Sequence, residues 1–267
     1  PAEPYTPLSL LPAELPQESK GTNRFENEKY VIAIGPIAVD EYYDALEWPK
    51  EGAKEIIKPT QNMVGGMIPN AACVFAGYGV KTYLADTLKE GSENTELMLN
   101  DIRSYGLNTD LIRFNPDIPD AKTYIIRTSK ERTILVIDSQ KPQMVFNEKE
   151  MEIFRNASYI YTTPIEISRV SDMDAFIEDV KSHGAKIVFD VEASTVEGCS
   201  KDLIYKADIL FLNEFGFEKI KGGRSDEDAF KEILGSGVEI VTITMGELGS
   251  YTVTKDTQVR VEATKQE

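Results

Sequence analysis

Histidine, cysteine and basic residues are scarce in this chain of 267 residues, and each shortage excludes a class of function. A single histidine, His183, and two cysteines, Cys73 and Cys199, provide too few ligands for a structural zinc site. Two cysteines also cannot build a disulfide framework, so we expect two reduced thiols in a cytoplasmic protein. His183 ends a predicted helix, where the helix dipole favours a cation, so capping is expected of it rather than catalysis.

Basic residues are outnumbered, since 29 Lys and Arg face 45 Asp and Glu, for a formal net charge of -16. A surface of this sign repels nucleic acid and anionic lipid, so no nucleic-acid partner is expected. No apolar run approaches the roughly 18 residues that cross a bilayer, so we expect no membrane span. Residues 1–29 are rich in Pro and Glu, lack the pattern of a secretory signal, and are interpreted as an N-terminal arm.

Short apolar runs alternate with amphipathic segments along most of the remaining sequence. Buried strands are predicted at 30–35, 80–85, 158–162, 186–191, 208–212 and 239–244. Helices are predicted at 69–77, 95–105, 171–183, 214–220 and 226–236. Strands separated by helices of about ten residues imply right-handed crossovers and a mainly parallel sheet with helices on both faces. The predicted fold class is an α/β sandwich.

Two segments do not follow this alternation of buried strands and helices. Residues 37–64 and 122–138 are β-rich, and the second contains KTYIIRT and RTILVID on either side of a three-residue turn, which predicts a hairpin. A further hairpin is predicted from 251–254 and 259–261. We expect the first two segments to form one small sheet inserted into an α/β domain that spans 30–267.

The strongest local motif is Gly65-Gly66-Met67-Ile68-Pro69-Asn70. Two glycines before a helix let the backbone approach a ligand closely, and Pro69 suits the first helical turn. Asn70 presents an amide at the open N-terminus of that helix, a combination that suits a polyhydroxyl ligand. The alternative is a glycine turn before a packed helix.

Further polar residues follow predicted strands, where ligands gather in open α/β sheets. Asp40, in GPIAVD, could accept hydrogen bonds from two adjacent sugar hydroxyls; the alternative is a turn or cap residue. Asn213-Glu214 follows DILFL and could reach a nucleotide or a hydrated magnesium ion, or could cap a helix. TMGELG (244–249) could admit a phosphate or a base, but also describes an ordinary hairpin turn.

In their order and placement these motifs resemble the PfkB family of carbohydrate kinases, which includes ribokinase, fructokinase and adenosine kinase. The matching pieces are GPIAVD (35–40), GGMIPNAACVFAGYGV (65–80), the hairpin 122–138, DILFLNE (208–214) and TMGELGSYTVT (244–254). The resemblance implies a ribokinase-like α/β/α sandwich with a small β-lid over the sugar site. It also implies transfer of the ATP γ-phosphoryl group to a sugar hydroxymethyl, with Mg²⁺ on the phosphates.

The resemblance also assigns roles by matching position. The sugar would be bound by Asp40, Gly65, Gly66 and Asn70. Asn213 would lie near the magnesium–phosphate network, and the nucleotide site would be lined by Thr244, Gly246 and Gly249. The lid would come from 37–64 and 122–138, with Arg127 and Arg132 as candidate contacts to phosphate or sugar.

Two departures from the family pattern stand out. The family's Asn-x-x-Glu would place a glutamate at 216, where this chain has Gly216; Glu214 and Glu218 are alternative metal ligands, and Glu214 is our candidate. The family's Gly-Ala-Gly-Asp loop, whose amides stabilise the transferred group and whose Asp takes the hydroxyl proton, does not occur in residues 1–267. No catalytic base is therefore assigned, and we expect a fragment of a longer protein or a homologue that binds without catalysis.

Two functions follow from this reading. The first is an ATP-dependent kinase acting on a sugar or a nucleoside, and the alternative is a catalytically inactive sugar-binding or regulatory protein on the same scaffold. A dinucleotide-dependent dehydrogenase is excluded because GPI (35–37) after the first strand lacks a Gly-x-Gly-x-x-Gly turn. Exposed strand edges and aromatics such as Tyr42 and Tyr43 in the lid predict a homodimer formed by two lids.

Overall fold

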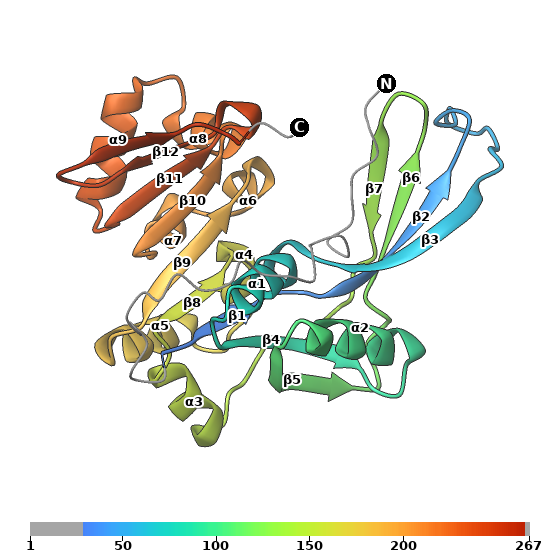
Figure 1. Cartoon of the computed structure of the whole chain (residues 1–267), viewed down its shortest axis with the longest axis horizontal. Coiled ribbons are helices and arrows are strands. Elements are labelled where there is room, and N and C mark those ends of the chain that lie inside the picture. Colours follow the sequence, from blue (N-terminus) through green and yellow to red (C-terminus); the bar gives the residue numbers. More distant parts are fainter. Residues whose placement is uncertain (1–28, 265–267) are drawn as a thin grey trace.

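A nine-stranded sheet lies at the centre of the computed structural model, which describes residues 29–264. The strand order is β13-β12-β11-β10-β9-β8-β1-β4-β5 (Figure 1). The strands are β1 (Val31–Ile34), β4 (Thr82–Lys89), β5 (Asn108–Asn115), β8 (Tyr159–Thr162), β9 (Lys186–Val191), β10 (Ile209–Asn213), β11 (Ile240–Thr244), β12 (Ser250–Val253) and β13 (Gln258–Val261). All neighbours from β11 to β5 pair in parallel, whereas β12 and β13 are added antiparallel. The predicted fold, an α/β structure with a mainly parallel sheet, is confirmed.

Helices cover both faces of this main sheet, because its strands are apolar on both sides. In β1, Val31 and Ala33 belong to one hydrophobic cluster, and the alternating Ile32 and Ile34 belong to the other. The first cluster lies under α1 (Met67–Gly77) and α2 (Glu93–Ser104). The second lies under α3 (Glu148–Arg155), α5 (Met173–Ser182), α8 (Glu214–Lys221) and α9 (Asp226–Gly235). Three shorter helices follow: α4 (Pro164–Ile167), α6 (Ala193–Gly198) and α7 (Lys201–Ile204).

The two β-rich segments form a second sheet of four strands, in the order β3-β2-β6-β7, which we call the lid sheet. Its strands are β2 (Ala38–Asp44), β3 (Lys58–Gly65), β6 (Lys122–Arg127) and β7 (Arg132–Val136). It projects from the main sheet at the upper right of Figure 1. The chain passes between the two sheets at 35–37, at 66, at 116–121 and at 137–147.

Several elements differ from the predictions. Strand β5 was not predicted, because only Leu111 and Ile112 of its eight residues are buried. Helix α3 was missed for the same reason, since Phe154 is its only fully buried residue. Strand β4 extends to Lys89, beyond the predicted end at 85, because its later polar residues, Asp86 among them, are buried as well. Burial in each case depends on neighbours that are distant in sequence.

Other predictions concern single residues. His183 occupies the C-cap position of α5, and its Nδ1 lies 2.8 Å from the carbonyl oxygen of Asp179, as expected of a capping residue. Cys73 and Cys199 are free. Within residues 29–264, no helix has the length and apolar character needed to cross a membrane. The predicted N-terminal arm lies, apart from Lys29, outside the described residues.

Candidate functional site

A cavity of about 410 Å³ lies between the lid sheet and the main sheet. On the main-sheet side it is lined by residues just after the ends of strands: Pro36, two positions after β1, Thr163 after β8 and Glu192 after β9. These three strands are neighbours and run parallel, so their carboxyl ends open at one edge of the sheet. On the lid side the lining includes Asp40 and Thr123. The cavity therefore occupies the edge where ligands of open α/β sheets bind.

Asp40 lies within strand β2, so the alternative of a turn or cap residue is wrong. Its backbone neighbour across the lid sheet is Thr123 of β6. Burial raises the pKa of the Asp40 carboxyl above its ordinary value of 3.8, and a hydrogen bond from the Thr123 side chain partly offsets this rise. The cavity thus contains a partly desolvated carboxylate, which accepts hydrogen bonds from hydroxyl groups more strongly than one in bulk water.

The glycine pair fits closely against Asp40. A Cβ atom at Gly65 would lie 3.0 Å from Cγ of Asp40 and would overlap with Oδ2. Gly66 has a φ of 126°, and a Cβ there would overlap with the carbonyl oxygen of Pro36. Gly66 therefore requires glycine, whereas a larger residue at Gly65 would have to displace the Asp40 carboxylate. Gly66 is also the N-cap of α1.

Asn70 is placed differently from the other predicted sugar ligands. It lies on the first turn of α1, where its backbone N–H donates to the carbonyl oxygen of Gly66 at 3.0 Å. Its side chain is exposed and does not line the cavity. The structure thus brings Asp40 and Gly66 together at one wall, with Gly65 behind the Asp40 carboxylate and outside the lining. It leaves Asn70 one turn away, so the roles of Gly65 and Asn70 in sugar binding stay predictions.

The cavity also contains charged residues that sequence reasoning missed: Lys141, Glu166 and Arg169. Oε2 of Glu166 accepts a hydrogen bond from Nη1 of Arg169 at 2.7 Å. Burial raises the pKa of Glu166, and the nearby Arg169 charge opposes that rise. Nη2 of Arg169 is enclosed without a hydrogen-bond partner in the described part of the chain. The sequence feature that could have pointed to this part of the cavity is Thr163-Pro164. It provides the N-cap and the first-turn proline of a helix, α4, directly after a buried strand.

The predicted nucleotide residues lie farther along the same edge. Strands β10 and β11 follow β9 in the sheet and run parallel to it, so their carboxyl ends adjoin the cavity. Asn213 ends β10 and caps α8, since its Oδ1 accepts a hydrogen bond from the Gly216 amide at 2.7 Å. Thr244 ends β11, and Gly246 and Gly249 have φ of 52° and 87° in the turn to β12. These residues share the edge but do not line the cavity, so their nucleotide role stays a prediction.

Among the residues that the structure describes, no group of three or more His, Cys, Asp or Glu could hold a metal ion. Glu214, the candidate ligand, is exposed on the first turn of α8. Gly216 has a structural reason to be glycine, because a Cβ there would lie 2.9 Å from the Val191 carbonyl oxygen. Mg²⁺ is commonly held by one or two carboxylates together with substrate phosphates. The described residues therefore do not form a cage of protein ligands, and the assignment of Glu214 as a metal ligand stays a prediction.

The two lid arginines do not line the cavity. Arg127 pairs with Asp44 at 2.8 Å, and its guanidinium lies 5.5 Å from the centre of the Tyr42 ring. Arg132 is exposed at the start of β7. Geometry therefore gives no support to the expectation that either arginine contacts a phosphate or a sugar.

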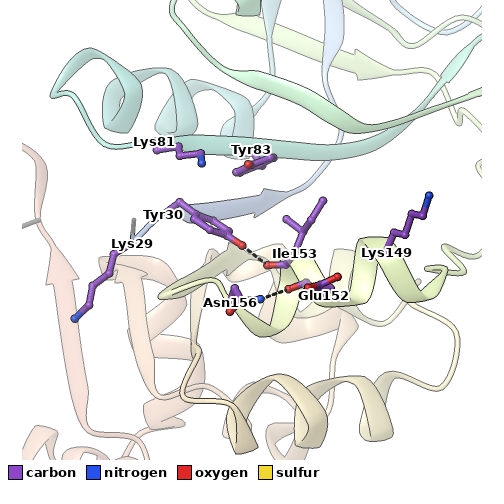
Figure 2. Close-up of a pocket in the computed structure, with 8 residues that line it drawn as sticks. All are labelled: Lys29, Tyr30, Lys81, Tyr83, Lys149, Glu152, Ile153 and Asn156. Carbon is purple, nitrogen blue, oxygen red and sulfur yellow. Dashed lines mark hydrogen bonds between the residues drawn. The ribbon is translucent and has the colours of Figure 1, made fainter. Parts of the chain in front are cut away.

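A larger cavity of about 530 Å³ lies at the opposite, amino ends of β1 and β4 (Figure 2). The Tyr30 hydroxyl donates to the Ile153 carbonyl oxygen at 2.7 Å, and the Lys81 ammonium lies 5.4 Å from the centre of the Tyr30 ring. In Figure 2, Lys29 and Lys149 point away from Tyr30 rather than toward a common centre. None of the predicted site residues lines this cavity, and it lies away from the carboxyl edge.

The family model described as pfkB family carbohydrate kinase matches residues 28–267. A ribokinase of Staphylococcus aureus (strain COL) is 24% identical over 247 residues, which cover 88% of this chain and 79% of that protein. The structure of Arabidopsis thaliana ribokinase complexed with ribose and ATP is similar with a TM-score of 0.72 at 20% identity, covering 88% of this chain and 78% of that one. Thermotoga maritima ribokinase is similar with a TM-score of 0.73 at 15% identity, with 90% and 79% covered.

At these identities the solved structures establish the ribokinase-like fold. The family match adds to this because it extends over nearly all of the chain, including every strand of both sheets and the cavity between them. The protein is therefore a kinase that belongs to the pfkB family of carbohydrate kinases.

Proposed function

We propose that the protein transfers the γ-phosphoryl group of ATP to a hydroxymethyl group of a sugar or of a sugar-containing molecule such as a nucleoside. The observation that carries this proposal is that Asp40 and Gly66 line one cavity on the carboxyl edge of the sheet, with Gly65 packed against the Asp40 carboxylate. ATP as co-substrate is supported by the Arabidopsis ribokinase complex. It is also supported by a putative ribokinase II of E. coli in complex with ATP and Mg²⁺, which has a TM-score of 0.73 at 15% identity.

In this proposal Asp40 accepts hydrogen bonds from two adjacent hydroxyls of the sugar. Gly65 and Gly66 leave room for that carboxylate and for close approach of the ligand, and Asn70 provides a further amide at the same end of α1. The cavity volume of about 410 Å³ falls within the range of roughly 300–1,000 Å³ that is usual for small-molecule sites. Asn213, Thr244, Gly246 and Gly249 line the adjoining nucleotide site, with Glu214 toward the magnesium ion.

The charges around the cavity favour an uncharged substrate. Each of the three cations that line it is already paired with a carboxylate. The pairs are Lys122–Glu41 at 2.7 Å, Lys141–Asp86 at 2.6 Å and Arg169–Glu166 at 2.7 Å. Three more carboxylates line the cavity without an ion pair within residues 29–264: Asp40, Asp138 and Glu192. A sugar phosphate or sugar acid would add a negative charge where no unpaired cation faces it, so we propose a neutral polyol as the substrate.

The test is ADP release with a panel of neutral sugars, nucleosides, sugar phosphates and sugar acids. We expect turnover with a neutral member of the panel, and loss of sugar binding in Asp40→Asn with ATP affinity unchanged. Asp256→Asn, which alters an exposed carboxylate in the turn between β12 and β13, is the matched control. Binding of a sugar by calorimetry without ADP release would favour the alternative of an inactive sugar-binding homologue, and binding of no sugar at all would refute the proposal.

We also propose that two copies pair through their lid sheets. The edge strand β7 is largely exposed, and its apolar residues Ile134, Leu135 and Val136 are 49%, 45% and 74% exposed. An apolar edge strand is a surface that proteins normally cover. Light scattering at micromolar concentration is expected to give a dimeric mass, and Val136→Lys is expected to give a monomer.

The two free cysteines support the further proposal of a reducing, cytoplasmic location.

A further inference from the structure

Asp86 is a charged residue in the middle of the buried strand β4, and its side chain is only 2% exposed. Its carboxylate is surrounded by donors. Oδ1 accepts the Thr87 amide at 2.8 Å, and Oδ2 accepts the Ile37 amide at 3.1 Å. The Lys141 ammonium, 1% exposed, lies 2.8 Å and 2.6 Å from the two oxygens. Each charged atom of the pair thus has at least one hydrogen-bond partner, and both side chains are nearly closed to solvent.

Its partners lie at the two ends of the lid. Ile37 lies in the passage that leads from β1 into β2, three positions before Asp40. Lys141 lies in the passage that returns from β7 to the main sheet. The same strand fastens another passage, because the Lys89 ammonium donates to the Ile118 carbonyl oxygen at 3.2 Å. Strand β4 thus contacts three of the four passages between the two sheets, and the Asp86 carboxylate joins the first to the last.

Stability alone does not explain such a pair. Burying two charges costs desolvation energy that their attraction often fails to recover, and apolar replacements of similar size are frequently as stable. The chain also accepts local strain to place Lys141, since the preceding residue, Gln140, has a φ of 46°. A buried ion pair does specify geometry, because each charge has one position in which its donors and acceptors are satisfied.

We propose that Asp86 and Lys141 are positioning residues that fix the lid against the main sheet. By holding Ile37 and Lys141 to one carboxylate, they set the separation between Asp40 on one wall of the cavity and residues 137–141 on the other. Lys141 is among the residues that line the cavity, but its ammonium is bonded to Asp86 and its side chain is only 1% exposed, so the pair acts through the walls that it holds. Only the consequence for sugar binding rests on the proposed function.

Lys141→Met tests this idea, because it removes the ammonium and leaves Asp86 with its two backbone amides. We expect hydrogen exchange at 36–40 and 137–141 to accelerate at least about tenfold, while the core of the main sheet stays protected. Sugar affinity is expected to fall about tenfold, because the walls of the cavity are no longer held at one distance, with ATP affinity unchanged.

Lys181→Met is the matched control. Lys181 pairs with Asp208 at 3.0 Å, and Asp208 also accepts a backbone amide, from Ile187, at 2.7 Å. This pair lies at the amino end of β10, away from the cavity, so we expect no change in lid exchange or in sugar affinity. If Lys141→Met does not fold, the double variant Asp86→Asn with Lys141→Met avoids an unpaired buried charge and takes its place.

The proposal is overturned if exchange at 36–40 and 137–141 is unchanged, or if it rises uniformly over the protein as it would after a general loss of stability. The two proposals can fail separately. If the unaltered protein binds no sugar, the kinase function is refuted, while the exchange data still decide whether Asp86 and Lys141 hold the lid.

Discussion

Replacing Gly65 by alanine alters the geometry of the proposed sugar site without removing any functional group. The added Cβ would lie 3.0 Å from Cγ of Asp40 and would overlap with Oδ2. To regain an ordinary contact of 3.4 Å or more, the carboxylate has to retreat by about 1 Å. Because Gly65 pairs across the lid sheet at the base of β2, near Asp40, its own backbone has little freedom to move instead.

The size of the effect follows from the hydrogen bonds that Asp40 makes to the sugar. Hydrogen bonds to a charged group contribute about 1.5–3 kcal/mol, and a displacement of about 1 Å weakens two of them at once. We expect Gly65→Ala to lose about 2 kcal/mol of sugar binding, or roughly 30-fold in Kd. The free energy of unfolding is expected to fall by only about 1 kcal/mol, since overpacking is partly offset by the better strand propensity of alanine.

The assay is calorimetric titration with the sugar found in the kinase screen, alongside titration with ATP and a thermal melt. Gly77→Ala, at the end of α1, is the control, because a Cβ there meets no atom within 4 Å. It is expected to leave both affinities unchanged. Unaltered sugar affinity in a folded Gly65→Ala protein would refute the placement of the sugar against Asp40.

Four further outcomes are expected. Because burial raises the pKa of Asp40, the sugar KM should begin to rise on acidification at a higher pH than an ordinary aspartate would give, and the Asp256→Asn control should show the same rise; a KM that does not change on acidification would contradict this. An acid with a raised pKa weakens folding once it ionises, so Asp40→Asn should also melt at a higher temperature at neutral pH than the unaltered protein. Gly216→Ala should lower the free energy of unfolding by about 1–3 kcal/mol, because its Cβ would lie 2.9 Å from the Val191 carbonyl oxygen; an unchanged chemical-denaturation midpoint would count against this packing. Gly249→Ala should disrupt the turn into β12, because φ is 87° and the Cβ would overlap with the Val261 carbonyl oxygen; intact exchange protection in β12 and β13 would contradict this.

The features that local sequence determined are those whose physical cause is also local. Apolar runs bounded by glycine predicted the parallel strands, because a strand buried on both faces needs apolar residues at every position. The glycine pair at 65 and 66 predicted a close approach of backbone, and the structure shows the reason in the Asp40 carboxylate and the Pro36 carbonyl oxygen. His183 was identified as a helix cap from the glycine that follows it.

Tertiary structure alone decided which polar residues meet. Asp86 and Lys141 are 55 positions apart, and nothing in the polar segment around Lys141 predicts that its ammonium is buried. Asn213 could be interpreted as a ligand or as a cap, and the hydrogen bond from the Gly216 amide to its Oδ1 shows that it caps α8, while its nucleotide role stays a prediction. Asn70 shares a motif with Gly66 but lies outside the cavity that Gly66 lines. Short-range patterns determine which elements form, whereas the partners of a charged side chain depend on how those elements pack, and that packing is a property of the whole chain.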